Sequence, residues 1–232
     1  MTIAENLHTI ENGIAETAKE YDRDPASIKL IAVSKRHSMD SINEATRAGQ
    51  FLFGENYIQE ASEKIKTAHK NAAFHFIGHI QSNKAKQASE LFSMIETVDR
   101  YKLARSLNTH LEKLDKQLDI LIQVNIGQDP NKSGVSPEKT AELLEQIKSL
   151  KQLRPLGLMT IPPLTRDSNM ARIHFRNLRI LSVDLAKQNL FANNDCVELS
   201  MGMSHDYKIA IQEGATIIRI GTAIFGKRPE RT

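Results

Sequence analysis

The chain has 232 residues, of which 40% are hydrophobic and 25% charged, and its formal net charge is only +3 at pH 7. A chain of this size buries roughly 70–75% of the surface that its unfolded form exposes, so it can build a full core. The basic residues are scattered among acidic ones, which argues against a nucleic-acid partner, and Lys64 and Lys66 are interpreted as part of a solvated helix face.

The N-terminal segment predicts an amphipathic helix, because Ile3, Leu7, Ile10 and Ile14 recur at helical spacing. Glutamates interrupt it, so it is not a signal peptide, and no window approaches the ~20 apolar residues that span a membrane. The single cysteine, Cys196, excludes an internal disulfide and opens an apolar run, which predicts a buried thiol. We therefore expect a cytoplasmic protein with no membrane partner.

After this helix, short apolar runs alternate with longer stretches of helical period. The runs predict strands at Ile28–Ser34, Phe51–Phe53, Phe74–Ile77, Met94–Val98, Leu118–Ile126, Arg154–Ile161, Val197–Met201 and Thr216–Gly221. Helices are predicted near 40–49, 57–69, 82–92, 100–116, 137–150, 169–190 and 205–213. Ser38 or Asp40 begins the first of these helices and Gly49 ends it, while Gly214 marks the end of the last.

Eight strands that alternate with helices imply an α/β fold with parallel pairing, because parallel neighbours need a crossover connection. The strands are nearly all apolar, as expected when both faces of a sheet are covered. A doubly wound open sheet and a closed (β/α)8 barrel both satisfy this pattern. The count of eight and the absence of an early Gly-x-Gly-x-x-Gly turn favour the barrel. No linker divides the chain, so we expect one domain over residues 1–232.

In such barrels the functional residues lie at the carboxyl ends of the strands. The first strand leads into Lys35, which by period two shares a face with Ile31 and Val33. If that face points into the barrel, burial favours the uncharged, nucleophilic amine that a Schiff base requires. The alternative is a lysine at a strand end that extends into solvent.

The last two strands lead into small hydrogen-bonding residues. The final strand carries Arg219 inside an apolar run, where a cation needs an anion or good hydrogen bonds. Gly221 and Thr222 follow it, and the preceding strand contains Ser200 with a glycine close behind. Two neighbouring ends of this kind are typical of a phosphate site, although structural turns alone could also explain them. Because closure sets the last strand beside the first, a ligand with a phosphate and an aldehyde, such as pyridoxal phosphate, fits near Lys35.

Seven motifs run in order through nearly the whole chain: Ala-Val-Ser-Lys35, Phe-Gly-Glu-Asn56-Tyr-Ile-Gln-Glu, His75-Phe-Ile-Gly-His-Ile-Gln-Ser-Asn-Lys84, Asn131-Lys132-Ser-Gly, Gly157-Leu-Met-Thr-Ile-Pro, Leu-Ser200-Met-Gly-Met-Ser and Arg219-Ile-Gly-Thr-Ala-Ile-Phe-Gly. Together they resemble the pyridoxal phosphate homeostasis protein family. The resemblance implies a single TIM-type barrel similar to the N-terminal domain of alanine racemase, which is fold type III of the pyridoxal phosphate proteins. It also implies a Schiff base between the cofactor and Lys35.

The resemblance assigns further roles to residues of this chain. It implies that Ser200, Gly221 and Thr222 hold the phosphate and that Met201 lines the site. It places Arg219 beside the pyridine ring or the phosphate and Asn56 near the ring. Lys132 matches a position proposed as a second place where the cofactor docks, and a loop lysine exposed to solvent is the alternative.

Two motifs carry no such prediction. Residues 127–133 look like a phosphate-binding P-loop, but the glycine before the lysine is missing and the spacing is one residue short. His75 and His79 share the spacing of zinc ligands on a helix, but they bracket a predicted strand end. We therefore expect no metal site.

The main hypothesis is a monomeric carrier that buffers pyridoxal phosphate inside the cell and delivers it to apo-enzymes. An amino-acid racemase-like enzyme with weak activity is the alternative, and Tyr57 or a histidine could then serve as the second base that racemisation needs. Related racemases take that base from a second domain, which a chain ending at Thr232 does not contain. Arg219 near the pyridine nitrogen would also make the ring a poor electron sink. A barrel that uses the cofactor only as a sensor for a protein partner is a third option.

Overall fold

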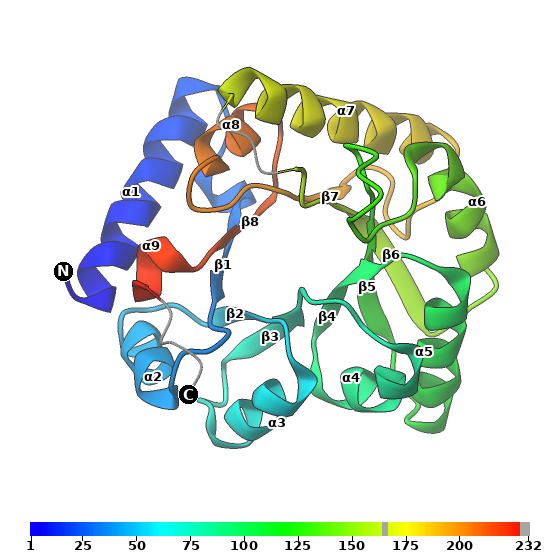
Figure 1. The fold of residues 1–232 in the computed structure, drawn as a ribbon, viewed down its shortest axis with the longest axis horizontal. Coiled ribbons are helices and arrows are strands. Elements are labelled where there is room, and N and C mark those ends of the chain that lie inside the picture. Colours follow the sequence, from blue (N-terminus) through cyan, green and yellow to red (C-terminus); the bar gives the residue numbers. More distant parts are fainter. Residues whose placement is uncertain (164–166, 228–232) are drawn as a thin grey trace.

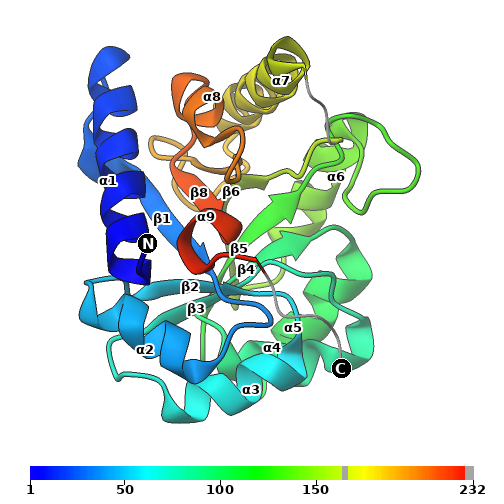
Figure 2. The same cartoon turned by 60° about the vertical axis from the view of Figure 1, so that its left-hand side comes forward.

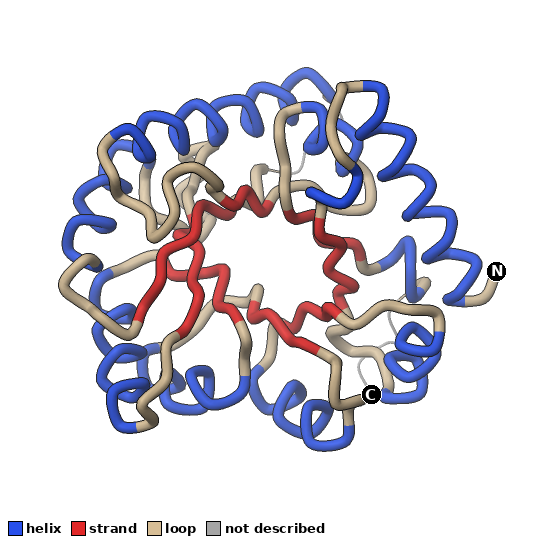
Figure 3. The backbone as a smooth tube through the Cα atoms, turned by 180° about the vertical axis from the view of Figure 1, so that it is seen from behind, coloured by secondary structure: helices blue, strands red, loops and turns tan. Residues whose placement is uncertain are grey.

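A computed structural model describes residues 1–163 and 167–227. Parallel strands form a closed ring surrounded by helices (Figures 1 and 3). The strands, in spatial and chain order, are β1 (Lys29–Val33), β2 (Leu52–Glu55), β3 (Ala73–Phe76), β4 (Met94–Val98), β5 (Leu118–Gln123), β6 (Leu153–Met159), β7 (Glu198–Ser200) and β8 (Ile217–Ile220). The helices are α1 (Ile3–Glu20), α2 (Met39–Arg47), α3 (Ile58–Thr67), α4 (Ala85–Leu91), α5 (Tyr101–Lys113), α6 (Pro137–Ile147), α7 (Ser168–Lys187), α8 (Tyr207–Gln212) and α9 (Thr222–Phe225).

The ring closes between its first and last strands. β1 pairs with β8 in parallel, with Ile31 opposite Arg219 and Ala32 opposite Ile220. This pairing confirms the predicted (β/α)8 barrel and rules out the doubly wound open sheet, whose edge strands would lack such partners. The carboxyl ends of β1 and β8 therefore lie next to each other at one mouth of the barrel.

The helix boundaries follow from local signals in the sequence. Ser38 caps the start of α2, and its hydroxyl accepts a hydrogen bond from the backbone N–H of Ser41. Gly49 and Gly214 have φ angles of +98° and +99°, which confirms the predicted helix ends, because L-residues rarely adopt this region. The short helix α9 was not predicted. It packs against α1, where Asn6 donates a hydrogen bond of 2.8 Å to the carbonyl of Ile224 (Figure 2).

Hydrophobic side chains pack in two layers. The larger layer lies between the strands and the surrounding helices. The smaller layer fills the interior of the barrel and consists of Ile31, Val33, Ile77, Met94, Leu121, Met159 and Ile217. The inner layer includes the two β1 residues that share a face with Lys35, so the predicted inward face of β1 is confirmed.

Two sequence-based expectations about burial are wrong. Cys196 is exposed, because β7 begins only at Glu198 and the preceding residues form a surface bend. Lys64 is buried on the inner side of α3, although its neighbour Lys66 is exposed as expected. Within residues 1–163 and 167–227, no helix has both the length and the apolar composition needed to cross a membrane.

Candidate functional site

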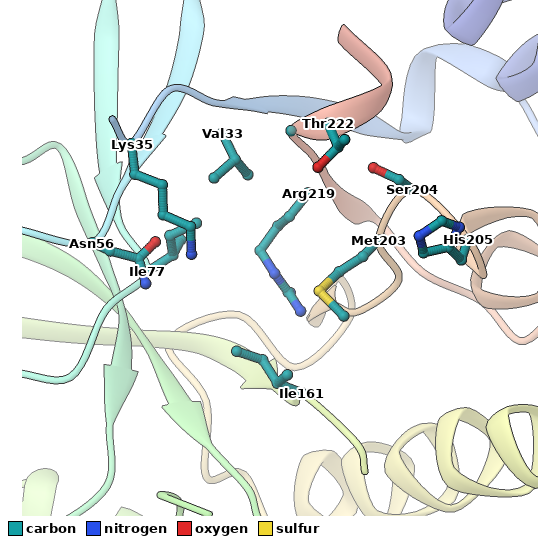
Figure 4. A pocket seen from close by; sticks show the side chains of 11 residues that line it. Val33, Lys35, Asn56, Ile77, Ile161, Met203, Ser204, His205, Arg219 and Thr222 are labelled. Carbon is teal, nitrogen blue, oxygen red and sulfur yellow. The ribbon is translucent and has the colours of Figure 1, made fainter. Parts of the chain in front are cut away.

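A cavity of about 230 Å³ opens at the carboxyl ends of the strands, where catalytic and binding sites of such barrels lie. Its walls come from the carboxyl ends of β1, β2, β3, β6 and β8 or the residues just after them, and from the segment after β7. The lining residues are Val33, Lys35, Asn56, Ile77, Ile161, Met203, Ser204, His205, Arg219, Gly221 and Thr222 (Figure 4). An apolar wall with a few polar groups that converge on one space is typical of a small-molecule site.

Lys35 and Asn56 extend into the cavity from the same side, from the segments that follow β1 and β2 (Figure 4). The two strands are paired, with Val33 opposite Gly54, so their ends are held together. The side-chain oxygen Oδ1 of Asn56 is buried and accepts no hydrogen bond from any of the described residues. A buried acceptor without a donor is costly, which makes Asn56 suited to a ligand that brings a donor.

Arg219 rises from β8 into the middle of the cavity and is held by a buried network beneath it (Figure 4). Its guanidinium donates hydrogen bonds to the hydroxyl of Ser200 and, at 2.8 Å, to the carbonyl of Thr160. The Ser200 hydroxyl donates in turn to Oε2 of Glu96. The other carboxylate oxygen of Glu96 accepts a bond of 2.7 Å from Nδ1 of His75. These strand residues join one buried cation to one buried anion through a shared hydroxyl.

The charges in this network stabilise each other. Burial alone would raise the pKa of Glu96, but the hydrogen bond and charge of His75 and the charge of Arg219 outweigh it, so the pKa lies below its usual value. Burial lowers the pKa of Arg219, against the opposing effect of Glu96 and Asp206. A guanidinium stays protonated in proteins, and it has donors but no acceptor. The centre of the cavity therefore presents a fixed cation.

Small hydrogen-bonding groups lie on the opposite side of the cavity from Lys35. Thr222 and Ser204 both line this side and carry the hydroxyl groups (Figure 4). Beside Thr222, a Cβ atom on Gly221 would stand 3.3 Å from both the Cβ and the carbonyl oxygen of Val33, which is tighter than most real contacts. The glycine lets β1 and β8 approach closely at the point where the two hydroxyls meet the cavity.

The structure brings together five of the seven predicted site residues. Those that line the cavity are Lys35, Asn56, Arg219, Gly221 and Thr222. Ser200 and Met201 do not line it, because both are fully buried and Ser200 is engaged by Arg219 and Glu96. After these two residues, Gly202 turns the chain with a φ angle of +92° and brings Met203 and Ser204 to the wall.

Met203, Ser204 and His205 were not predicted as site residues, although Met203 and Ser204 stand in the same Ser-Met-Gly-Met-Ser motif. The motif contains a signal that could have identified Ser204. A glycine after a strand end turns the chain, so the hydroxyl beyond the turn can reach a ligand that the hydroxyl before it cannot. Tyr57, considered as a second base, is exposed and lies outside the lining of the cavity.

Two further cavities adjoin the first around Ile161. One, of about 270 Å³, shares Asn56 and Ile77 with it, and the other, of about 540 Å³, shares Met203 and His205. Lys132 lines both of these neighbouring cavities, and its ammonium donates a hydrogen bond of 2.8 Å to the carbonyl of Pro162. The part of the chain that the structure describes holds no cluster of three potential metal ligands.

The family model that describes the N-terminal domain of alanine racemase matches residues 6–229. Among curated proteins, the pyridoxal phosphate homeostasis protein of Pasteurella multocida is 42% identical over 231 residues, which cover 98% of each chain. The protein of the same name from Schizosaccharomyces pombe is 40% identical over 205 residues, covering 88% of this chain and 85% of that one.

Solved structures show the same relationship. PipY of Synechococcus elongatus, solved with PLP bound, is 36% identical, with a TM-score of 0.85 over 97% of this chain and 100% of its own. Alanine racemase from Corynebacterium glutamicum is only 15% identical, with a TM-score of 0.71, and shares the fold alone. The match covers 98% of this chain but 60% of the racemase chain.

Proposed function

This chain belongs to the pyridoxal phosphate homeostasis protein family, and from that premise we propose that it binds pyridoxal 5′-phosphate at the barrel mouth and buffers and delivers it inside the cell. The observation that carries the proposal is the pairing of β1 with β8, which sets Lys35 and Thr222 around one cavity. We further propose that residues 1–232 form one domain that binds the cofactor.

The residues of the cavity fit this cofactor. Lys35 offers an amine for the aldehyde, and the hydroxyls of Ser204 and Thr222 offer donors for the phosphate on the opposite side. The unpaired oxygen of Asn56 offers an acceptor on the same side as Lys35. Apolar side chains complete the wall, as the faces of an aromatic ring require.

Each polar residue then has a separate task. Lys35 would hold the cofactor covalently, because its amine can condense with the aldehyde to a Schiff base with release of water. Arg219 can donate a hydrogen bond to the pyridine nitrogen but cannot supply a carboxylate that would keep that nitrogen protonated. A bound ring of this kind is a weaker electron sink when its nitrogen is not protonated. Arg219 therefore favours holding the cofactor over turning over a substrate.

We expect Ser204 and Thr222, together with Gly221, to hold the phosphate, in place of the Ser200 that the sequence pattern favoured. Replacing Ser204 and Thr222 with Ala should weaken the affinity for pyridoxal phosphate by about 1–3 kcal/mol, since each loses a hydrogen bond to a charged group. Titration with pyridoxal, which lacks the phosphate, is the matched measurement and should show little change.

The matched control for this pair is Ser200→Ala, which alters the setting of Arg219 and should affect pyridoxal phosphate and pyridoxal alike. Two results would reject the assignment. One is an unchanged affinity in the Ser204 and Thr222 variant. The other is a loss specific to the phosphorylated ligand in Ser200→Ala.

A carrier and a racemase-like enzyme predict different outcomes when the loaded protein meets its possible substrates. With each common amino acid, we expect negligible inversion of chirality, because Arg219 beside the pyridine nitrogen would leave the ring a poor electron sink. With an apo-enzyme and a trap for free cofactor, we expect the apo-enzyme to gain activity. Turnover of any amino acid at about 1 per second or faster would favour the enzyme. Transfer blocked completely by the trap would favour a sensor.

A further inference from the structure

A buried ion cluster lies directly behind Lys35, outside the cavity. Its centre is Lys64 of α3, which is only 6% exposed. The ammonium of Lys64 donates hydrogen bonds of 2.7 Å to Glu55, 2.6 Å to Glu60 and 2.7 Å to the backbone carbonyl of Ser34. The Ser34 hydroxyl donates to the same oxygen of Glu55, also at 2.7 Å. None of these four residues lines the cavity.

Burying such a cluster costs free energy. Lysine and glutamate are almost never fully buried unless they are paired, and the loss of hydration costs several kcal/mol per ion. Burial raises the pKa of Glu55, against the opposing charge of Lys64 and the hydrogen bonds from Lys64 and Ser34. Oxygen Oε2 of Glu55 is also buried and has no hydrogen-bond partner among the described residues. Apolar side chains would fill the same space at a lower cost in free energy, which indicates that the cluster has a role besides packing.

The contacts of the cluster converge on the backbone around Lys35. The Ser34 carbonyl that Lys64 binds belongs to the peptide bond that enters Lys35. The backbone N–H of Arg36, which belongs to the peptide bond that leaves Lys35, donates to Glu60. Arg36 also has a φ angle of +66°, a region that costs a residue with a side chain about 1–2 kcal/mol. Both peptide groups that flank Lys35 are thus held by one cluster.

We propose that Lys64, together with Glu55 and Glu60, positions Lys35 by fixing both peptide bonds beside it, so that the amine meets the aldehyde of the bound cofactor. This inference rests on the proposed function, since it assigns the cluster a task in forming the Schiff base on Lys35. The four-carbon side chain of a lysine is flexible, and its reach into the cavity depends on where its Cα and Cβ are held. Fixing the backbone sets that direction before the ligand arrives.

The test separates covalent attachment from noncovalent binding. The variants are Glu60→Ala, on the partly exposed edge of the cluster, and Lys64→Met, at its centre. The matched controls are Glu63→Ala and Lys66→Met, which break an exposed pair on the same helix. For each protein, the rate of Schiff base formation with pyridoxal phosphate is followed by absorbance. The affinity for pyridoxine 5′-phosphate, which has no aldehyde, is measured in parallel.

We expect both cluster variants to form the Schiff base at least about tenfold more slowly, because a displacement of about 1 Å can cost a reaction about a hundredfold. Their affinity for pyridoxine 5′-phosphate should stay at the level of the unaltered protein, and both controls should match it in both measurements. Since Lys64→Met leaves two carboxylates without their cation, Glu60→Ala decides the question if Lys64→Met does not fold.

Two outcomes would overturn the positioning role. In one, Glu60→Ala forms the Schiff base at the rate of the unaltered protein. In the other, the affinity for pyridoxine 5′-phosphate falls as much as the rate does, which means that the cluster supports the whole cavity and not Lys35 in particular. Failure of the proposed function looks different, because the unaltered protein itself then forms no Schiff base on Lys35.

Discussion

Replacing Lys35 with Ala is expected to abolish the visible absorbance band of the Schiff base and the adduct that survives borohydride reduction. The reason is geometric: Lys35 is the lysine that lines the cavity holding Arg219 and Thr222. Noncovalent binding should persist at lower affinity, because the hydroxyls of Ser204 and Thr222 are untouched. Absorbance spectra and the mass of the reduced protein measure both effects.

Lys132→Ala is the matched control for this experiment. Lys132 lines the two neighbouring cavities, and its ammonium is bonded to the carbonyl of Pro162. We expect the Lys132 variant to keep the band and the adduct. If the band persisted in the Lys35 variant and vanished in the Lys132 variant, the covalent site would lie in a neighbouring cavity.

The largest effect on stability is expected from Glu96→Ala. Glu96 is fully buried and compensates Arg219 through Ser200, so its removal leaves a buried cation without its anion. Breaking a buried pair of this kind costs about 3–5 kcal/mol of the free energy of unfolding. Denaturant unfolding at neutral pH measures the loss. The matched control, Glu145→Ala, removes an exposed partner of Lys148 and should cost only about 0–1 kcal/mol.

The same residue predicts how stability depends on pH. Because the pKa of Glu96 is lower in the folded state, its ionised form contributes stability that is fully present above the unfolded pKa of about 4.3. That contribution is lost as the pH falls through the pKa of the folded state. Glu96→Gln should therefore be less stable at neutral pH and lose less stability on acidification. If the variant lost stability at low pH as steeply as the unaltered protein does, the result would contradict the network of Arg219, Ser200 and Glu96.

The fold could be predicted from the sequence because each strand is covered on both faces and reads as a short apolar run. β4 was predicted to the residue, and the other strands differ by a few residues at their ends. The predicted strand up to Ile126 ends earlier, at Gln123, because Val124 bridges Val135 outside the barrel strands. α9 was missed because a helix of four residues is too short to show periodicity.

The candidate site could be predicted only where chain topology decides it. Lys35 and Thr222 were placed together because barrel closure sets their strands side by side. Whether Ser200 faces a ligand or a buried charge depends on Glu96, which lies 104 residues away in the sequence. The role of Lys64 could not be predicted for a similar reason. Its spacing from Glu60 is that of an ordinary surface ion pair on a helix. Its further contacts, with Glu55 and Ser34, arise only from tertiary packing.

The most direct measurement is peptide mapping of the unaltered protein after loading with pyridoxal phosphate and reduction with borohydride. The proposed geometry predicts a single modified peptide that carries the adduct on Lys35. An adduct confined to another lysine, or none at all, would contradict the claim that this amine and the phosphate-binding hydroxyls serve one ligand.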